Sequence, residues 1–244
     1  FFESINVERM QGSAKDKAIV KVDVQEQSTG QLTFGAGFSS SAGIMGDIGI
    51  SEKNFLGQGQ EVALKLRIAS LASEIDLSFT EPYFLDREIR AGFDVFHMTR
   101  DLQDTSSYNT KNTGFGLRAG YKITDFLRQD WGYNLRFEKL EDISSSASSS
   151  IKNANANQST SQIAHTITYD ERDRIMTPTE GHIIRLNTQV AGLGGTTKHI
   201  RNVFKAAKYY PISEKWVASI TGKAGYIVGL GQDIHVLKRF NLGP

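Results

Sequence analysis

Cysteine is absent from the 244 residues of this chain. That absence excludes a disulfide framework, a thiolate metal site and a thiol nucleophile. A long apolar run is also missing, because the longest uncharged stretch, Ser28 to Gly46, is mainly glycine, serine and threonine. A membrane-spanning helix needs about 20 predominantly apolar residues, so the sequence excludes a helical membrane protein.

A charge excess of either sign is lacking too. The chain has 28 basic and 27 acidic residues, a net charge of +1, so it offers no basic field for nucleic acid, and no nucleic-acid partner is expected. It begins at Phe1 without an initiator methionine or a signal-peptide pattern, and we interpret it as part of a longer protein. Its length fits one large domain.

What the sequence has instead is alternation with a period of two. From Val62 to Ala69, branched side chains occupy every second position and alternate with alanine, lysine and arginine, which is typical of a β-strand with two unlike faces. The pattern recurs in residues 75–80, 115–123, 131–138, 163–170, 182–190 and 216–228. We count about eleven strands between Gly30 and Leu230, many of them ten or more residues long.

The length and charge of these strands favour a membrane barrel. Tilted strands that cross a bilayer need about 9 to 11 residues, whereas strands of soluble sandwiches average about 5 to 6. The face opposite the apolar one carries many charges, as expected for a wet lumen; they are Arg67, Asp76, Arg90, Asp94, Arg118, Lys122, Arg136, Glu138 and Lys223. A large soluble antiparallel sheet with one solvated face has the same pattern and stays an alternative.

The connections favour the barrel over the soluble sheet. Compact segments (54–59, 82–86, 124–128, 177–181 and 211–215) alternate with longer polar ones, among them 101–111 and 144–159. Outer-membrane barrels have this asymmetry of short periplasmic turns and long outer loops. Aromatic residues gather at the compact ends, where we expect a membrane-interface girdle of Tyr83, Phe84, Phe126, Trp131, Tyr210 and Trp216.

The first residues do not continue the barrel pattern. Phe1 to Gln27 contains two short strands, at 5–7 and 19–24, joined by a turn at 11–14, and its charge is denser. We interpret it as the tail of a soluble domain. Single-chain bacterial barrels have even strand numbers, so a count of about eleven implies that further strands are missing.

No constellation in the sequence argues for an enzyme. Histidines 97, 165, 182, 199 and 235 are scattered without helical pairing, so no metal ligand is assigned. The charges from Asp170 to Arg174 are interpreted as a turn held by opposite charges. Ser149 and Lys152 lie in a low-complexity loop that cannot preorganise a nucleophile, and Gly57-Gln58-Gly59 lacks the context of a dinucleotide loop. We assign no catalytic residue and no cofactor.

The first strand of the barrel is the unusual one. It comprises Gly30, Gln31, Leu32, Thr33, Phe34, Gly35, Ala36, Gly37, Phe38 and Ser39. Glycines within a strand weaken it and loosen its register, so this strand could part from a neighbour and pair with another chain. The alternative is that Gly35 and Gly37 only allow sharp curvature or fit beneath packed side chains.

At this point an ordered set of motifs resembles the BamA family of outer-membrane barrel proteins, whose barrels follow periplasmic POTRA domains. The set covers essentially the whole chain: Phe1 to Val7, Val24 to Gly30, Gly35 to Ser39, Glu52 to Gln60, Thr80 to Phe84, and Asp170 to Gly181. The family's Arg-Gly-Phe signature in the sixth outer loop would follow Phe240 to Gly243, and the chain stops at Pro244 before it.

The resemblance implies that residues 1–28 end the last POTRA domain and that residues 29–244 begin a sixteen-stranded antiparallel transmembrane barrel, stopping in the sixth outer loop. It implies folding and insertion of other barrel proteins into the bacterial outer membrane, with the N-terminal segment in the periplasm. Nascent barrel proteins, which would pair along Gly30 to Ser39, the lipid bilayer and accessory lipoproteins are the implied partners. A TamA-like relative, a polypeptide-secreting transporter and a passive channel stay alternatives.

Overall fold

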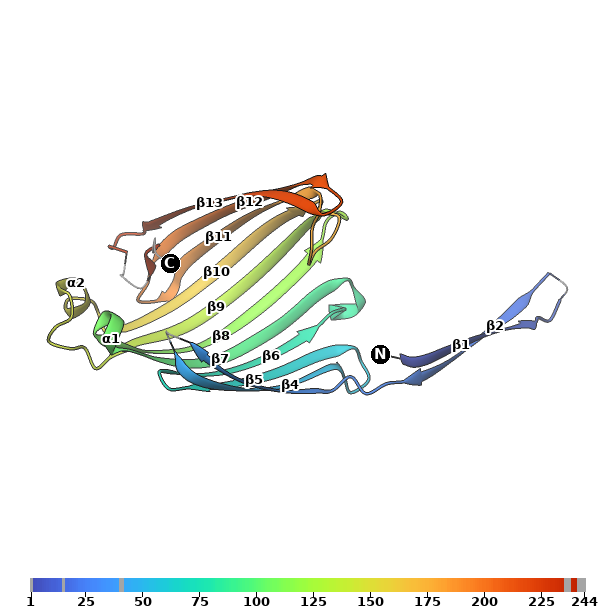
Figure 1. The fold of residues 1–244 in the computed structure, drawn as a ribbon, viewed down its shortest axis with the longest axis horizontal. Coiled ribbons are helices and arrows are strands. Elements are labelled where there is room, and N and C mark those ends of the chain that lie inside the picture. The colour runs from blue at the N-terminus through green and yellow to red at the C-terminus, as the bar shows by residue number, and fades with distance from the viewer. Residues whose placement is uncertain (1, 15, 40–41, 235–237, 241–244) are drawn as a thin grey trace.

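A computed structural model describes residues 2–14, 16–39, 42–234 and 238–240. An N-terminal hairpin consists of β1 (Phe2–Gln11) and β2 (Ala18–Glu26). It projects from one end of a large curved sheet (Figure 1). The two strands confirm those expected before the barrel, and both are longer than the alternation indicated.

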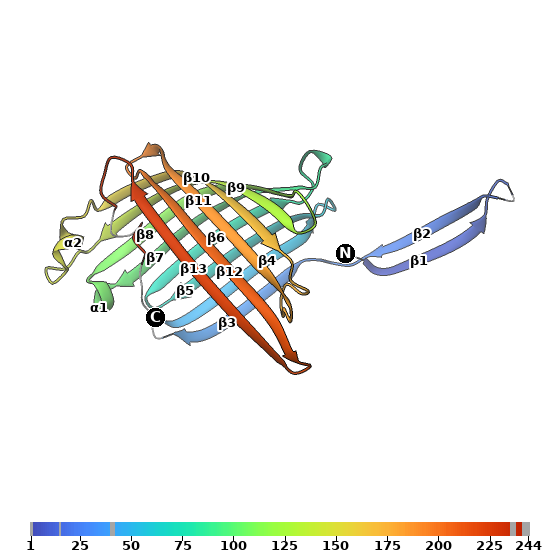
Figure 2. The same ribbon diagram turned by 90° about the horizontal axis from the view of Figure 1, so that it is seen from above.

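The large sheet has eleven strands in sequence order, each antiparallel to the next. Its strands are β3 (Gln31–Ser39), β4 (Gly43–Phe55), β5 (Gln60–Ala69), β6 (Ala72–Glu81), β7 (Ile89–Leu102), β8 (Tyr108–Lys122), β9 (Leu127–Glu141), β10 (Asn157–Asp170), β11 (Gly181–Gly195), β12 (His199–Ser213) and β13 (Trp216–Gly229). The sheet curls into a tilted barrel wall (Figures 1 and 2). The predicted count of about eleven strands and the antiparallel barrel are confirmed.

The two faces of the sheet differ as the alternation predicts. On the convex face the apolar side chains stand exposed, with Phe34, Ile68 and Ile220 each 69–73% accessible. The other face carries cross-strand ion pairs such as Arg67 Nε to Asp47 Oδ1 (2.6 Å) and Arg118 Nη1 to Asp94 Oδ2 (2.5 Å). Apolar groups stay exposed on this scale only where lipid covers them, so the convex face is the lipid-facing one.

The only helices among the described residues are short: the 3₁₀ turn η1 (Phe84–Asp86), α1 (Gln103–Ser106) and α2 (Ser149–Lys152). In this part of the chain no helix has the length and apolarity needed to cross a membrane. α2 belongs to the segment 142–156, which a small cluster of Tyr108, Leu140, Ala147 and Ile151 anchors to the sheet. The serine-rich loop is therefore packed against the sheet, and β10 starts at Asn157, within the range 144–159 that was assigned to the loop.

Two expected connections are wrong in detail. Residues 101–111 are mostly strand, because β7 and β8 stay in register up to the pair Leu102 and Tyr108. Polarity there marks strand ends that extend beyond the apolar band, and polar residues pair in a ladder as readily as apolar ones. Residues 177–180 are only the end of a ten-residue connection, 171–180, and Gly181 already begins β11. Conversely, the connections 70–71 and 196–198 at the end with α1 and α2 are tight.

Candidate functional site

The candidate site is the first strand of the sheet, β3, which lies at one end of the strand order. Among the described strands it pairs with β4 alone, from Gln31 opposite Ser51 to Ser39 opposite Gly43. With nine residues it is the shortest strand of the sheet, whereas β8 and β9 have fifteen each. β13 lies at the other end of the order (Figure 2). Fewer main-chain hydrogen bonds therefore hold β3 than any interior strand.

Ion pairs on the lumen face link β4 to β5 and β5 to β6, whereas β3 contributes the Thr33 hydroxyl, which donates to the carbonyl oxygen of Gly49 on β4 at 3.3 Å. Asp47 on β4 receives a hydrogen bond from Arg67 Nε on β5 (2.6 Å), and Arg67 Nη1 also contacts Glu74 on β6 (3.4 Å). Opposite Asp47, β3 has Gly35, which has no side chain to join this chain of ion pairs. A Cβ added there would come within 3.0 Å of Asp47 Oδ2. Gly35 thus makes room for the carboxylate, in line with the packing interpretation of the strand's glycines.

The lipid-facing side of β3 makes few contacts of its own. Leu32, Phe34 and Phe38 expose 60%, 73% and 78% of their surface. Large aromatic side chains beside an unpaired strand edge can cover an incoming strand as well as lipid, because alternate side chains of an added strand point to the same face. The edge of β3 therefore offers main-chain hydrogen-bond donors and acceptors together with exposed apolar side chains that could pack on an added strand.

The base of β3 is fastened more firmly than its length. The Thr29 hydroxyl donates to Glu52 Oε1 at the end of β4, and the same oxygen accepts the N–H of Asn54 at 2.8 Å. Gly30 follows directly, and a Cβ there would lie 3.2 Å from Glu52 Oε2. The strand is therefore anchored where it leaves the hairpin, and main-chain pairing holds most of the rest.

The structure brings the six predicted interface aromatics to one end of the barrel. Tyr83, Phe84 and Phe126 lie in the β6–β7 and β8–β9 turns, and Trp131, Tyr210 and Trp216 lie in the parts of β9, β12 and β13 next to the turns; all six are 45–72% exposed. This is the end from which the N-terminal hairpin projects (Figure 1). Their placement fits a girdle at a membrane surface, and their contact with that surface stays a prediction.

The charged segment after β10 is a turn held by opposite charges, as expected. Arg172 donates from Nε and Nη2 to the two oxygens of Asp170 at 2.8 and 2.7 Å, and this pairing raises the pKa of the Arg172 guanidinium. Asp173 accepts the Thr179 hydroxyl (2.6 Å) and the N–H groups of Thr179 and Glu180 (2.8 and 3.1 Å). These hydrogen bonds, led by the hydroxyl, hold the pKa of the Asp173 carboxyl well below its usual range.

A lumen contact that sequence reasoning missed involves the last described residues. Lys238 donates to Glu138 Oε2 on β9, and both side chains are only 12% exposed. Phe240 lies beneath the guanidinium of Arg201, 4.5 Å from the ring centroid, and covers Gly225. Residues 238–240 therefore fold back against the lumen face. The expected sixth outer loop includes residues 241–244, which lie outside the described ones.

No metal centre takes shape among the described residues, where no three histidine or acidic side chains come together as a ligand set. The structure describes four of the five histidines, and three of these make side-chain contacts within or beside the sheet. His97 Nδ1 lies 2.7 Å from the Thr113 hydroxyl, and His165 stacks on Trp131 at 4.1 Å. His182 contacts Glu171 at 3.4 Å. The candidate site therefore consists of backbone and apolar surface.

These observations define an antiparallel transmembrane β-barrel wall whose shortest strand lies at the end of the sheet. Residues 54–244 match the model of the Omp85 superfamily domain. The chain belongs to the Omp85 superfamily, and the resemblance inferred from its motifs is confirmed.

Two curated relatives have the same name. The chain is 29% identical to "Outer membrane protein assembly factor BamA" of Neorickettsia risticii, over 99% of this chain and 33% of that protein. It is 28% identical to the BamA of Nitratidesulfovibrio vulgaris, over 100% of this chain and 31% of that protein. The chain thus spans about a third of the length of these relatives.

A solved structure supports the same fold. The crystal structure of BamA from Haemophilus ducreyi lacking POTRA domains 1–3 superposes with a TM-score of 0.83 at 21% identity. The match covers 100% of this chain and 50% of that one.

Proposed function

We propose that this chain belongs to an outer-membrane protein that folds and inserts other β-barrel proteins, and that β3 is the edge on which the substrate strand pairs. The observation that carries the proposal is the position of β3: short, glycine-containing and at the end of the sheet order. An edge strand is a template for strand addition, and main-chain hydrogen bonds accept many substrate sequences. The names of the relatives as assembly factors support the same role.

In this proposal residues 1–28 end a periplasmic POTRA domain and residues 29–244 begin the barrel. The hairpin β1–β2 projects from the end that carries the aromatic girdle, which we take as the periplasmic end of the barrel in the outer membrane. The substrates are nascent outer-membrane barrel proteins, and accessory lipoproteins are further partners. The role requires no covalent chemistry, because strand exchange trades one set of main-chain hydrogen bonds for another.

The proposed pairing edge runs from Gly30 to Ser39. The fastened base at Thr29 and Glu52 keeps the strand aligned. Parting the strand from β4 breaks its main-chain hydrogen bonds and the hydrogen bond that the Thr33 hydroxyl donates to the carbonyl oxygen of Gly49 (3.3 Å). A substrate strand added in register places its own apolar residues beside Phe34 and Phe38 on the lipid side. The added strand then presents its apolar side chains to lipid and its polar side chains to the lumen, as β3 does.

The test reconstitutes the full-length protein into phospholipid vesicles and adds an unfolded outer-membrane barrel protein from urea. The folded fraction is followed by its resistance to unfolding in cold detergent gels. An insertase raises the folding rate at least about tenfold over protein-free vesicles, a barrier lowered by about 1.4 kcal/mol. A passive channel would give ion conductance with no acceleration, and that result would reject the proposal.

A further inference from the structure

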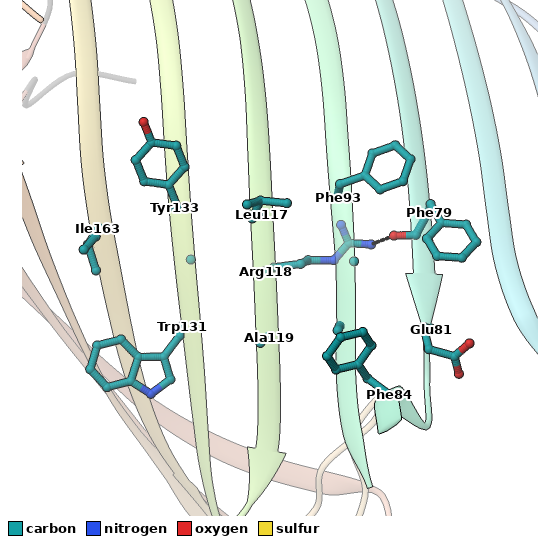
Figure 3. Close-up of a pocket in the computed structure, with 13 residues that line it drawn as sticks. Phe79, Glu81, Phe84, Phe93, Leu117, Arg118, Ala119, Trp131, Tyr133 and Ile163 are labelled. Carbon is teal, nitrogen blue, oxygen red and sulfur yellow. Dashed lines mark hydrogen bonds between the residues drawn. The ribbon is translucent and has the colours of Figure 1, made fainter. Parts of the chain in front are cut away.

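A concave apolar groove lies on the lipid-facing side of the sheet, away from β3. It has a volume of about 460 Å³, within the range of small-molecule sites. Its lining comes from five adjacent strands, β6 to β10, together with η1 (Figure 3). Because neighbouring strands lie about 4.8 Å apart, the groove runs roughly 19 Å across the strands.

Alternating large and small side chains create the groove. Ala91 and Ala119 are cross-strand partners and form a low floor between Glu81 on one side and Trp131 on the other. The next row along the strands carries large side chains, with Phe79, Phe93, Leu117 and Tyr133 in register. The phenyl rings of Phe79 and Phe93 stack at 5.5 Å. Phe84 from η1 also lines the groove, and in the view of Figure 3 its ring lies between Ala119 and Glu81.

The groove is closed towards the lumen. Arg118 lies behind it, with Nη1 on Asp94 (2.5 Å) and Nη2 donating to the carbonyl oxygen of Phe79 (3.0 Å). A Cβ added at Gly92 would come within 2.9 Å of the Arg118 guanidinium carbon, so the arginine fills the space behind the floor. A ligand can therefore enter only from the membrane side.

One carboxylate stands at the mouth of the groove. Glu81 Oε2 accepts the amide of Gln60 at 2.8 Å, and Oε1 accepts the N–H of Tyr83 at 2.9 Å. These contacts fix the group at the level of the aromatic girdle, where lipid headgroups meet the barrel. A fixed negative charge beside an apolar groove matches a ligand with a cationic head and a hydrocarbon tail.

We propose that this groove binds one phospholipid whose headgroup carries a primary ammonium. One acyl chain lies over Ala91 and Ala119 between the aromatic walls, and the ammonium pairs with Glu81. The inference rests on the lipid-facing orientation of this face and does not depend on the insertion role of β3.

The test uses tryptophan fluorescence, because Trp131 lines the groove and Trp216, the other tryptophan of this chain, does not. In the full-length protein all tryptophans but one are replaced, to give a Trp131 form and a Trp216 form. Each is placed in phosphatidylcholine vesicles with a small fraction of phosphatidylethanolamine or phosphatidylcholine brominated on the acyl chain. Quenching reports how often the brominated chain contacts the indole.

The proposal expects brominated phosphatidylethanolamine to quench Trp131 about threefold more effectively than brominated phosphatidylcholine, a preference that an exposed ion pair supplies. Trp216 should show no preference. Glu81→Gln should abolish the preference and keep the quenching, whereas Ala119→Leu should fill the groove and reduce quenching of Trp131 by both lipids. Cold-detergent gels check that each variant is folded.

Three results would overturn the proposal. Equal quenching of Trp131 by the two lipids would show no headgroup site, and an equal preference at Trp216 would show general enrichment around the barrel. Trp131 shielded from both lipids would mean that protein occupies the groove. Insertion measured on the same samples separates these outcomes from a failure of the proposed function.

Discussion

Gly35 on β3 lies directly against the carboxylate of Asp47 on β4, where even one added methyl group would come within 3.0 Å of Oδ2. The carboxylate is held from its other side by Arg67 Nε at 2.6 Å. The pair explains where the ion pairs that join β4, β5 and β6 stop. They end at a glycine, so β3 is held by its main chain, by the Thr33 hydroxyl on the carbonyl oxygen of Gly49 (3.3 Å) and by Thr29 at its base.

Double-mutant cycles should therefore give different coupling energies with Asp47→Ala for the two substitutions Gly35→Ala and Gly37→Ala. A Cβ at Gly37 would be 3.7 Å from Met45 Cγ, an ordinary contact, so Gly37→Ala should stabilise the barrel by about 0.5–1 kcal/mol through lost glycine entropy. Gly35→Ala should stabilise the barrel less than Gly37→Ala does, because the Asp47 side chain has to move. In the Asp47→Ala background, Gly35→Ala should stabilise the barrel as much as Gly37→Ala does. Urea unfolding in vesicles measures both cycles.

The expected coupling between Gly35→Ala and Asp47→Ala is at least about 0.5 kcal/mol, and Gly37→Ala with Asp47→Ala should be additive within about 0.3–0.5 kcal/mol. Equal coupling in the two cycles would show that Gly35 has no special relation to the carboxylate. In the insertion assay Gly37→Ala should also slow folding of the substrate if β3 must part from a neighbour.

The assignment of the two faces predicts unequal losses of stability when arginine is placed at two adjacent positions of β11. Leu186 points to lipid and is 42% exposed, whereas Asn187 lies on the lumen face and donates to the Thr166 hydroxyl at 2.7 Å. Leu186→Arg should cost about 2–4 kcal/mol of unfolding free energy in vesicles, and Asn187→Arg should cost far less. A larger loss for Asn187→Arg would mean that the faces are reversed.

The sequence predicts the features of this fold that depend on residues close together in the chain, and it does not predict contacts between distant residues. The alternation from Val62 to Ala69 is local, and it gives strand and faces without knowledge of neighbours. The contact between Lys238 and Glu138 joins residues a hundred positions apart, and no local pattern encodes it. The same holds for the groove, whose walls at Phe79, Trp131 and Ile163 meet only through sheet register.

The errors have a physical reason as well. Residues 101–111 read as a polar loop because their side chains face water, yet the ladder between Asp101 and Asn109 continues beyond the apolar band. Polar side chains indicate that a segment faces water, and they do not indicate that it is a loop. Main-chain pairing between strands does not require apolar side chains. The candidate edge was found from glycine content, and its terminal place in the sheet follows from chain order.

The buried pair of Lys238 and Glu138 should be sensitive to the loss of one partner. Glu138→Ala leaves an ammonium group without its counter-charge at a site where both side chains are 12% exposed, and we expect a cost of about 3 kcal/mol. The double variant Glu138→Met with Lys238→Met should recover most of it. Urea unfolding measures the stability, and trypsin cleavage after Arg239, which every variant keeps, reports on this segment locally. Equal stability of the single and double variants would contradict the pairing.

The turn held by Asp173 should persist in acid. Its pKa is lowered by the Thr179 hydroxyl and the N–H groups of Thr179 and Glu180, so the folded pKa lies below the unfolded value. The contribution of Asp173 is then fully present above pH ~4 and is lost only as the pH falls below that value. Hydrogen exchange of residues 173–180, corrected for intrinsic rates, should show constant protection from neutral pH to that point.

Asp173→Asn provides the control for that measurement. The amide is a weaker acceptor than the carboxylate, so protection of the Thr179 and Glu180 amides should be reduced already at neutral pH. Loss of protection in the unaltered turn between neutral pH and pH ~5 would point to a different titrating group.

Disulfide crosslinking to a substrate during insertion tests directly whether β3 is the pairing edge. Single cysteines at positions from Gln31 to Phe38, and at Leu117 in the interior strand β8, are introduced into a cysteine-free form of the full-length protein and oxidised with a stalled barrel substrate carrying one cysteine in a terminal strand. We predict crosslinks along β3, with register following the substrate position, and none from Leu117. Absence of crosslinks along β3, or equal yields from Leu117, would show that β3 is not the pairing edge.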